Sequence, residues 1–210
     1  SAGMLNRGVS NAQKKVEERN FAMRKHLLEY DDVLNQQREI IYDLRNKALL
    51  SDSIKDTINE FIEDFIFDII GDLDFRQVKE WDWQSINQQI NSNLMVNIEV
   101  GEIESLESLD ELIDYINEEA LKYYKLKEDV IPSELLRKVE KFIVLKTIDE
   151  KWRNHLLGMD QLREGIGLRA YGQKNPLIEY KSESYNFFQE LMVSLRATVI
   201  QRVFLSLIHI

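Results

Sequence analysis

Apolar residues recur along the first fifty positions at spacings of three, four or seven residues. This spacing places them on one face of an α-helix, because a helix turns once in about 3.6 residues. The residues of this face are Val16, Met23, Leu27, Tyr30, Leu34, Ile41, Leu44 and Ala48. No Gly or Pro interrupts residues 9–70. The pattern therefore predicts one long helix from about Asn11 to Leu50.

This helix also carries apolar residues away from its main face, and they predict a second apolar face. They are Phe21, Leu28, Val33 and Ile40. A helix of this length would measure roughly 60 Å at about 1.5 Å per residue, which exceeds the width of a small domain. We therefore expect the helix to need packing partners that the rest of the chain does not fully supply.

Residues 53–131 have the pattern of a separate small helical unit. One apolar stripe consists of Ile54, Ile58, Phe61, Ile62, Phe65 and Ile69. Gly71 follows this stripe at the place where a helix commonly ends. A second, shorter stripe of Trp83, Ile86 and Ile90 predicts another helix.

The remainder of this middle region combines a predicted loop with a third helix. Residues 95–101 alternate between apolar and polar, but the sequence shows no second strand that could pair with them, so we predict a loop. Ser108 and Glu111 have the spacing of a capping box, in which each side chain accepts a hydrogen bond from a free backbone N–H. A helix is therefore expected from this point to about Lys127.

The last third of the chain shows two further helical stripes, separated by a glycine-rich segment at residues 164–176. Pro132 precedes the first stripe, as suits a helix start. The first stripe is Leu135, Val139, Phe142, Leu145, Ile148, Trp152, Leu156, Met159 and Leu162, and the second is Tyr185, Phe188, Met192, Leu195, Val199 and Val203. Two stripes with a short connection predict an antiparallel helical hairpin. The predicted fold class is all-α.

Charge and composition narrow the classes of function. The chain has a formal net charge of −10, no Cys and 44% hydrophobic residues. Residues 53–131 hold six Lys/Arg and twenty Asp/Glu, a net charge of −14. The chain lacks the clustered cations that nucleic-acid binding requires. It also lacks the run of about 18 apolar residues that would span a membrane. We expect a cytoplasmic protein.

The sequence predicts no catalytic, cofactor or metal site. Gly165, Gly167 and Gly172 have the spacing GxGxxxxG, which differs from that of a dinucleotide-binding loop, and GxxxxGK[ST] is absent. The three histidines are scattered, with no HExxH motif. His155 is expected on a helix surface or as a hydrogen-bonded core residue.

The glycine-rich segment is the candidate contact site. Beside its glycines it carries Leu168, Arg169, Tyr171 and Lys174. A connection that only reverses the chain direction is usually short and polar. The aromatic ring and the two cations favour contact with a partner, with Gly165, Gly167 and Gly172 giving flexibility. An equally weighted alternative is a simple turn in which Tyr171 folds back onto the hairpin.

Two long segments resemble signatures of SecA, the bacterial preprotein-translocase motor. They are NAQKKVEERNFAMRKHLLEYDDVLNQQREIIYDLRN at 11–46 and TIDEKWRNHLLGMDQLREGIGLRAYGQKNPLIEYKSES at 147–184. Both occur in the order expected for that family. The acidic stretch between them has a suitable length but matches weakly.

The resemblance implies a helical scaffold and wing region of such a motor. It implies that residues 1–52 form the first long scaffold helix, 53–131 the helical wing domain, and 132–210 the two-helix finger. In this family ATP and magnesium bind in N-terminal motor domains, which have no counterpart here. The resemblance further implies that the finger tip enters the SecY channel and touches the unfolded preprotein, and Tyr171 matches the tip tyrosine of the family motif. An aromatic ring suits contact with many different sequences.

Two classes of function follow from these patterns. The first is a non-catalytic region that couples ATP turnover in the motor domains to preprotein movement, in a protein peripheral to the inner face of the bacterial plasma membrane. The second is a free-standing helical interaction scaffold or holdase that uses its exposed apolar faces. The two classes differ in whether the coding sequence continues upstream into a nucleotide-binding motor.

Overall fold

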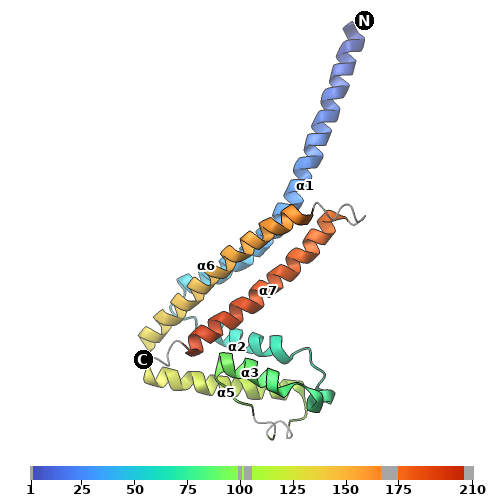
Figure 1. The fold of residues 1–210 in the computed structure, drawn as a ribbon. Helices are drawn as coiled ribbons and strands as arrows, with labels where there is room; N and C mark the ends of the chain where they lie inside the picture. The colour runs from blue at the N-terminus through green and yellow to red at the C-terminus, as the bar shows by residue number, and fades with distance from the viewer. Residues whose placement is uncertain (1, 99–100, 102–105, 167–174, 206–210) are drawn as a thin grey trace. The chain divides into compact units, whose positions relative to one another are not determined.

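The computed structural model describes residues 2–98, 101, 106–166 and 175–205, and the regular elements among them are helices (Figure 1). They are α1 (Ala2–Leu50), α2 (Lys55–Ile70), the 3₁₀-helix η1 (Phe75–Glu80), α3 (Trp83–Leu94), α5 (Leu109–Val130), α6 (Ser133–Ile166) and α7 (Pro176–Leu205). The predicted all-α fold class is confirmed. The candidate tip residues Leu168, Arg169, Tyr171 and Lys174, with Gly167 and Gly172, lie outside the described residues.

The chain forms two compact units, each built from segments that are distant in the sequence. Unit 1 contains Ser1–Tyr42 and Leu157–Phe188, and unit 2 contains Asp43–Leu156 and Gln189–Ile210. The long helices α1, α6 and α7 each contribute residues to both units. Unit 1 is therefore a three-helix assembly, whereas unit 2 also includes α2, η1, α3 and α5.

Helix α1 begins at Ala2, earlier than the predicted Asn11. Gly3 and Gly8 each cost about 1 kcal/mol relative to Ala in a helix. No Pro or other stop signal follows them, so the helix continues through both glycines. Both predicted apolar faces are exposed over the first half of α1: Val16, Phe21, Met23, Leu27 and Leu28 are all exposed.

The predicted main face of α1 becomes buried only toward its C-terminal end. Ile41 and Ala48 are buried there. Val33, predicted on the second face, packs instead against the buried residues of unit 1 together with Tyr30 and Leu34. Residues of both predicted faces of α1 are therefore packed at this position, because α6 and α7 both contribute to that cluster.

The acidic middle region folds around α2, which contacts both α5 and α3. Gly71 caps the C-terminus of α2, and its amide donates to the Phe67 carbonyl at 2.8 Å. Its φ of −61° lies in the right-handed region, so this position does not need a glycine in order to adopt a left-handed conformation. The buried apolar side chains of this region include Ile54, Ile58, Phe61, Ile62, Phe65, Ile66, Ile70, Ile86, Ile90, Leu94, Leu112, Ile116 and Ala120.

The predicted capping box at the start of α5 is present in a shifted form. The Glu111 amide donates to Ser108 Oγ at 3.2 Å. The Glu111 carboxylate accepts from the amide of Glu107, at 2.8 Å, where a standard capping box would use the amide of Ser108. The 3₁₀-helix η1 was not predicted. The signal for it is Asp74, whose carboxylate accepts from the Arg76 amide and caps its first turn.

The predicted inward register was wrong in parts of α6 and α7. Leu135, Phe142 and Tyr185 are exposed. The residues buried in their place include Leu136, Glu140, Ile143, Val144, Tyr180, Leu191, Ile200 and Phe204. Glu140 explains the error in α6: this buried carboxylate lies on the inward row and accepts a hydrogen bond from Tyr124. A charged residue in the core breaks the apolar pattern from which the row was inferred.

Helices α6 and α7 run antiparallel, as predicted. In unit 2, Arg202 donates to Thr147 Oγ1 at 3.0 Å, and Lys151 donates to Ser194 Oγ at 2.6 Å. Partner numbers on α7 thus fall as those on α6 rise, which defines antiparallel helices. In unit 1 the ring of Phe187 covers Gly158 so closely that a Cβ at Gly158 would lie 2.5 Å from Cε1.

Candidate functional site at the helical hairpin

The described part of the candidate site is the helical support on either side of residues 167–174. Gly165 is the one predicted site residue that is described. It is exposed in the last turn of α6, and among the described residues a Cβ there would meet no atom within 4 Å outside its own helix backbone. Gly165 is thus helical, and its predicted role in tip flexibility stays a prediction. The contact roles of Leu168, Arg169, Tyr171 and Lys174 also stay predictions.

Helices α1, α6 and α7 pack together in unit 1, where α6 ends and α7 begins. The buried centre of this cluster consists of Met159, Ile166 and Tyr180. Tyr30, Val33, Leu34 and Leu162 pack against this centre and are partly buried. Ile166 is the last residue of α6, so apolar packing extends to the point where the candidate tip segment begins.

Aromatic packing joins α1 to the first turns of α7. The rings of Tyr30 and Tyr180 lie 4.7 Å apart between centroids, at an interplanar angle of 52°. Tilted aromatic pairs of this kind contribute beyond their buried area, by about 0.5–1.5 kcal/mol. Burial also raises the pKa of the Tyr180 hydroxyl above its ordinary value. Tyr180 therefore stays neutral at physiological pH and serves as a packing residue.

Two polar contacts also join α1 to α7 and to α6 in unit 1. The side-chain amide of Gln37 donates to the backbone carbonyl of Ser184 at 2.9 Å, and both residues are buried. On the solvent side, Arg163 donates to the Asp31 carboxylate at 3.1 Å. Exposed ion pairs contribute little stability, at most about 1 kcal/mol. The buried amide contact is therefore the more important of the two for aligning α1 with α7.

Helix α7 begins at a defined cap directly after the candidate tip segment. Asn175 Oδ1 accepts from the Leu177 amide at 3.0 Å, and the Asn175 carbonyl accepts from the Glu179 amide at 3.1 Å. Pro176 occupies the first helical position, where its missing N–H costs nothing. The sequence prediction missed Asn175, although Asn followed by Pro is a recognisable helix start.

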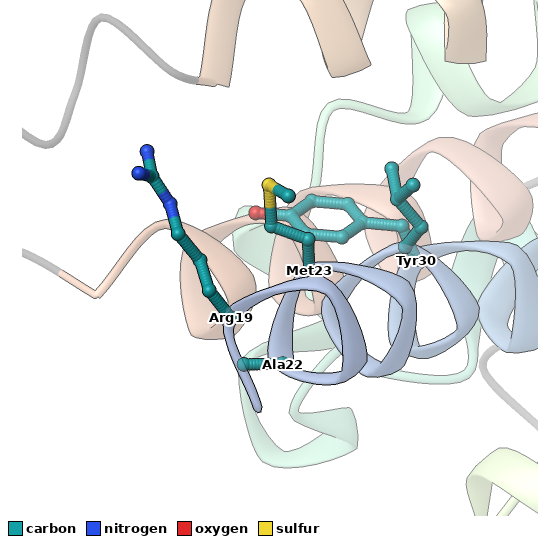
Figure 2. A pocket seen from close by; sticks show the side chains of 5 residues that line it. Arg19, Ala22, Met23 and Tyr30 are labelled. Atoms are coloured by element: carbon teal, nitrogen blue, oxygen red, sulfur yellow. The ribbon is translucent and has the colours of Figure 1, made fainter. Parts of the chain in front are cut away.

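A separate apolar pocket lies on the exposed half of α1. It has a volume of about 420 Å³ and is lined by Arg19, Ala22, Met23, Leu27 and Tyr30. Figure 2 shows the Met23 side chain beside the Tyr30 ring, with Arg19 at the edge. The apolar pattern had marked Met23, Leu27 and Tyr30 as one face. Arg19 and Ala22 were missed because neither is a strongly apolar residue.

The described residues contain neither a metal cluster nor a membrane span. Among residues 2–98, 106–166 and 175–205, no group of three or more His, Asp or Glu side chains could hold a metal ion. Within the same residues, no helix has the length and hydropathy needed to cross a bilayer. His155 is buried and stacks on Trp152 with ring centroids 5.3 Å apart. It is therefore a core residue, one of the two places expected for it.

The fold defines an all-α protein with an acidic helical middle region and a long helical hairpin. A family model described as the SecA Wing and Scaffold domain matches residues 1–206. The chain therefore belongs to the SecA wing and scaffold family, as the two sequence signatures predicted.

Individual relatives agree with the family match. Protein translocase subunit SecA of Heliobacterium modesticaldum is 38% identical over 97% of this chain and 24% of its own length. Protein translocase subunit SecA 1 of Chlorobium chlorochromatii is 41% identical over 96% of this chain and 20% of its own length. Protein translocase subunit SecA of Prosthecochloris aestuarii is 44% identical over 90% of this chain and 18% of its own length. The chain thus spans about a fifth to a quarter of these relatives.

Proposed function

We propose that this chain is the non-catalytic scaffold and wing region of a protein-translocating ATPase. In this proposal it couples ATP turnover in other domains to the movement of unfolded preprotein through the SecY channel. The observation that carries the proposal is the match over residues 1–206 to a SecA wing and scaffold family, with relatives named protein translocase subunits. ATP and magnesium would bind in the parts of the protein that correspond to the relatives' remaining length.

The proposal assigns one part of this function to each region. Residues 1–52 would form the scaffold helix that contacts the motor domains, 53–131 the wing, and 132–210 the two-helix finger. The exposed apolar residues on the first half of α1 support contact with further protein, because large apolar patches on soluble proteins usually mark interaction sites. The whole protein would act as a peripheral protein at the inner face of the bacterial plasma membrane.

The finger tip is the proposed polypeptide contact. Tyr171 would touch the preprotein, and Leu168, Arg169 and Lys174 would contact the preprotein or the channel. The buried cluster at the end of α6 and the Asn175 cap at the start of α7 support this role. Packing and capping fix the helix ends on either side of residues 167–174, as a contact that transmits force requires.

The exposed apolar surface of α1 also favours a second candidate function, a free-standing holdase. Phe21 and Leu28 are 65% and 62% exposed, and both would be available to an unfolded client. One assay distinguishes the two functions. A holdase should suppress aggregation of an unfolded protein when the isolated chain is added without ATP, whereas a coupling region on its own should not.

The direct test is a chimera in which this chain replaces the matching region of the Heliobacterium modesticaldum protein. ATP-dependent import of a preprotein into vesicles that contain the channel is the readout. We expect import by the chimera and none by a version that lacks the region. A folded chimera that hydrolyses ATP but does not import would argue against the proposal.

A further inference from the structure

Gly158 in α6 and Phe187 in α7 lie against each other in the helical hairpin of unit 1. A Cβ atom added to Gly158 would lie 2.5 Å from Cε1 of Phe187 and 3.4 Å from both Cδ1 and Cζ. Carbon atoms that are not bonded to each other pack at about 3.5–4.0 Å, so the first of these distances is a steric clash. With the ring in this place, position 158 therefore accepts glycine and no larger residue.

The backbone conformation of Gly158 does not itself require glycine. The residue lies in the interior of α6 and does not have a positive φ. Glycine inside a helix is less favourable than alanine by about fivefold in an equilibrium constant, or about 1 kcal/mol. At Gly71, by contrast, the atoms nearest to an added Cβ belong to Phe67 of the same helix. The close approach of a second helix is therefore what requires glycine at position 158.

This contact lies at the solvent edge of the three-helix core. Met159, the next residue of α6, belongs to the buried cluster of unit 1, and successive residues of a helix point in directions about 100° apart. Gly158 is therefore beside the core, and it is half-buried. On α7 the same change occurs between Phe188, which is 8% exposed, and Phe187, which is 40% exposed. The Phe187 ring thus lies on α6 with part of its surface in contact with solvent.

The contact adds a second point at which α7 meets α6 in unit 1. At the first point, Tyr180 packs with Met159 and Ile166 of α6 in the buried cluster. Phe187 follows Tyr180 by about two helical turns, so both side chains are on the same side of α7. A slide of α7 by one turn along α6 would move the Phe187 ring from Gly158 onto a residue that carries a Cβ. The contact therefore opposes sliding of one helix along the other.

We propose that Gly158 and Phe187 form a lock between the two hairpin helices, in which the Phe187 ring occupies the gap that glycine leaves on α6 and fixes α7 at one position along α6. Both act as positioning residues. This inference goes beyond the proposed function and rests on the geometry of unit 1 alone, so its test does not depend on preprotein transport.

A double-mutant comparison of the full chain tests the lock. Amide hydrogen exchange, read by mass spectrometry at residues 157–163 and 183–188, measures local opening. In the wild type, Gly158→Ala should make exchange about fivefold faster, because the added methyl group overpacks against the ring. Phe187→Met replaces the ring by a flexible, unbranched chain that can bend away from the methyl group. In that background Gly158→Ala should make exchange about fivefold slower, since alanine is the better helix former.

Gly165→Ala is the matched control on the same helix. Gly165 is exposed, and among the described residues an added Cβ would meet no atom within 4 Å outside its own helix backbone. The control should therefore have the same effect in both backgrounds. An effect of Gly158→Ala that does not reverse between the backgrounds would overturn the lock, and so would a control that reverses as well. If Gly158→Ala alone lost helical circular dichroism, Phe187→Met should restore it, and a double variant that stays unfolded would also overturn the proposal.

Discussion

The side-chain amide of Gln37 on α1 donates a hydrogen bond to the backbone carbonyl of Ser184 on α7 across 2.9 Å. These residues are 147 positions apart and both are buried. Gln37 belongs to the first of the two family signatures, and Ser184 is the last residue of the second. The contact therefore joins in space the two segments by which the family was first inferred.

Removing this amide should destabilise unit 1. Gln37→Ala deletes the donor and leaves a small cavity, so we expect a loss of about 1–3 kcal/mol in the free energy of unfolding. Gln36→Ala is the control, because Gln36 is exposed on the same helix and its loss should cost less than about 0.5 kcal/mol. Urea denaturation of both variants measures the difference. Equal stabilities for the two variants would mean that the amide contact contributes nothing.

Two adjacent phenylalanines on α7 allow a matched test of burial. Phe188 is 8% exposed and Phe187 is 40% exposed. Phe188→Ala should cost about 3–5 kcal/mol, through lost burial and the cavity that remains. Phe187→Ala should cost clearly less, since much of its ring already faces solvent. Thermal melting followed by circular dichroism compares the two. A larger loss for Phe187→Ala would contradict the register of α7 described above.

His155 should make stability depend on pH in the mildly acidic range. Burial lowers its pKa from 6.5 to about 4. Between these values the unfolded chain binds a proton that the folded chain does not. The contribution of His155 to stability is therefore fully present above about pH 6.5 and is lost as the pH falls toward 4. The loss amounts to roughly 3.5 kcal/mol at most, at about 1.4 kcal/mol per pKa unit.

The measurement compares the wild type with His155→Gln at pH 7 and at pH 5. Carboxylates also titrate near the lower pH, but they do so in both proteins and cancel in the comparison. The wild type should lose more stability than the variant between the two pH values. Equal losses would show that His155 is accessible to protons in the folded state.

The isolated chain should not bind ATP. The sequence has no glycine-rich phosphate loop, and the family resemblance places nucleotide binding in other domains. Calorimetric titration with ATP and magnesium should show no heat of binding. Saturable binding at micromolar concentrations would require a nucleotide site within these residues. It would contradict the proposal that other domains bind the nucleotide.

Much of the fold could be predicted from apolar periodicity, and the error in α6 has a definite physical cause. Helix α2 and its end at Gly71 were predicted because the apolar stripe and the stop signal agree. The inward row of α6 was predicted wrongly because Glu140 is a charged residue in the core, where it bonds to Tyr124 and Arg137. Single-sequence patterns do not show which charges have buried partners.

The candidate site was predictable only in part. The tip residues were marked by composition and by the family signature, because both are local properties of the sequence. The contacts that support the tip were not predicted, since Gln37–Ser184 and Tyr30–Tyr180 join residues that are distant in the sequence. Asn175 was recognisable as a helix cap before Pro176 and was missed.

The central claim is that Tyr171 of the hairpin contacts the polypeptide and does not contribute to the stability of the fold. A tip substitution usually changes stability by less than about 0.5 kcal/mol. Tyr171→Ala should therefore melt at nearly the same temperature as the wild type. In the full-length protein, basal ATP turnover should survive because the nucleotide would be bound by other domains.

The most direct measurement is preprotein import into channel-containing vesicles by full-length protein carrying Tyr171→Ala, with the melting temperature of the same variant as its control. We predict import reduced to a small fraction of the wild-type rate, with an unchanged fold and unchanged basal ATP turnover. Normal import by a stably folded variant would contradict the account, and so would a large drop in melting temperature.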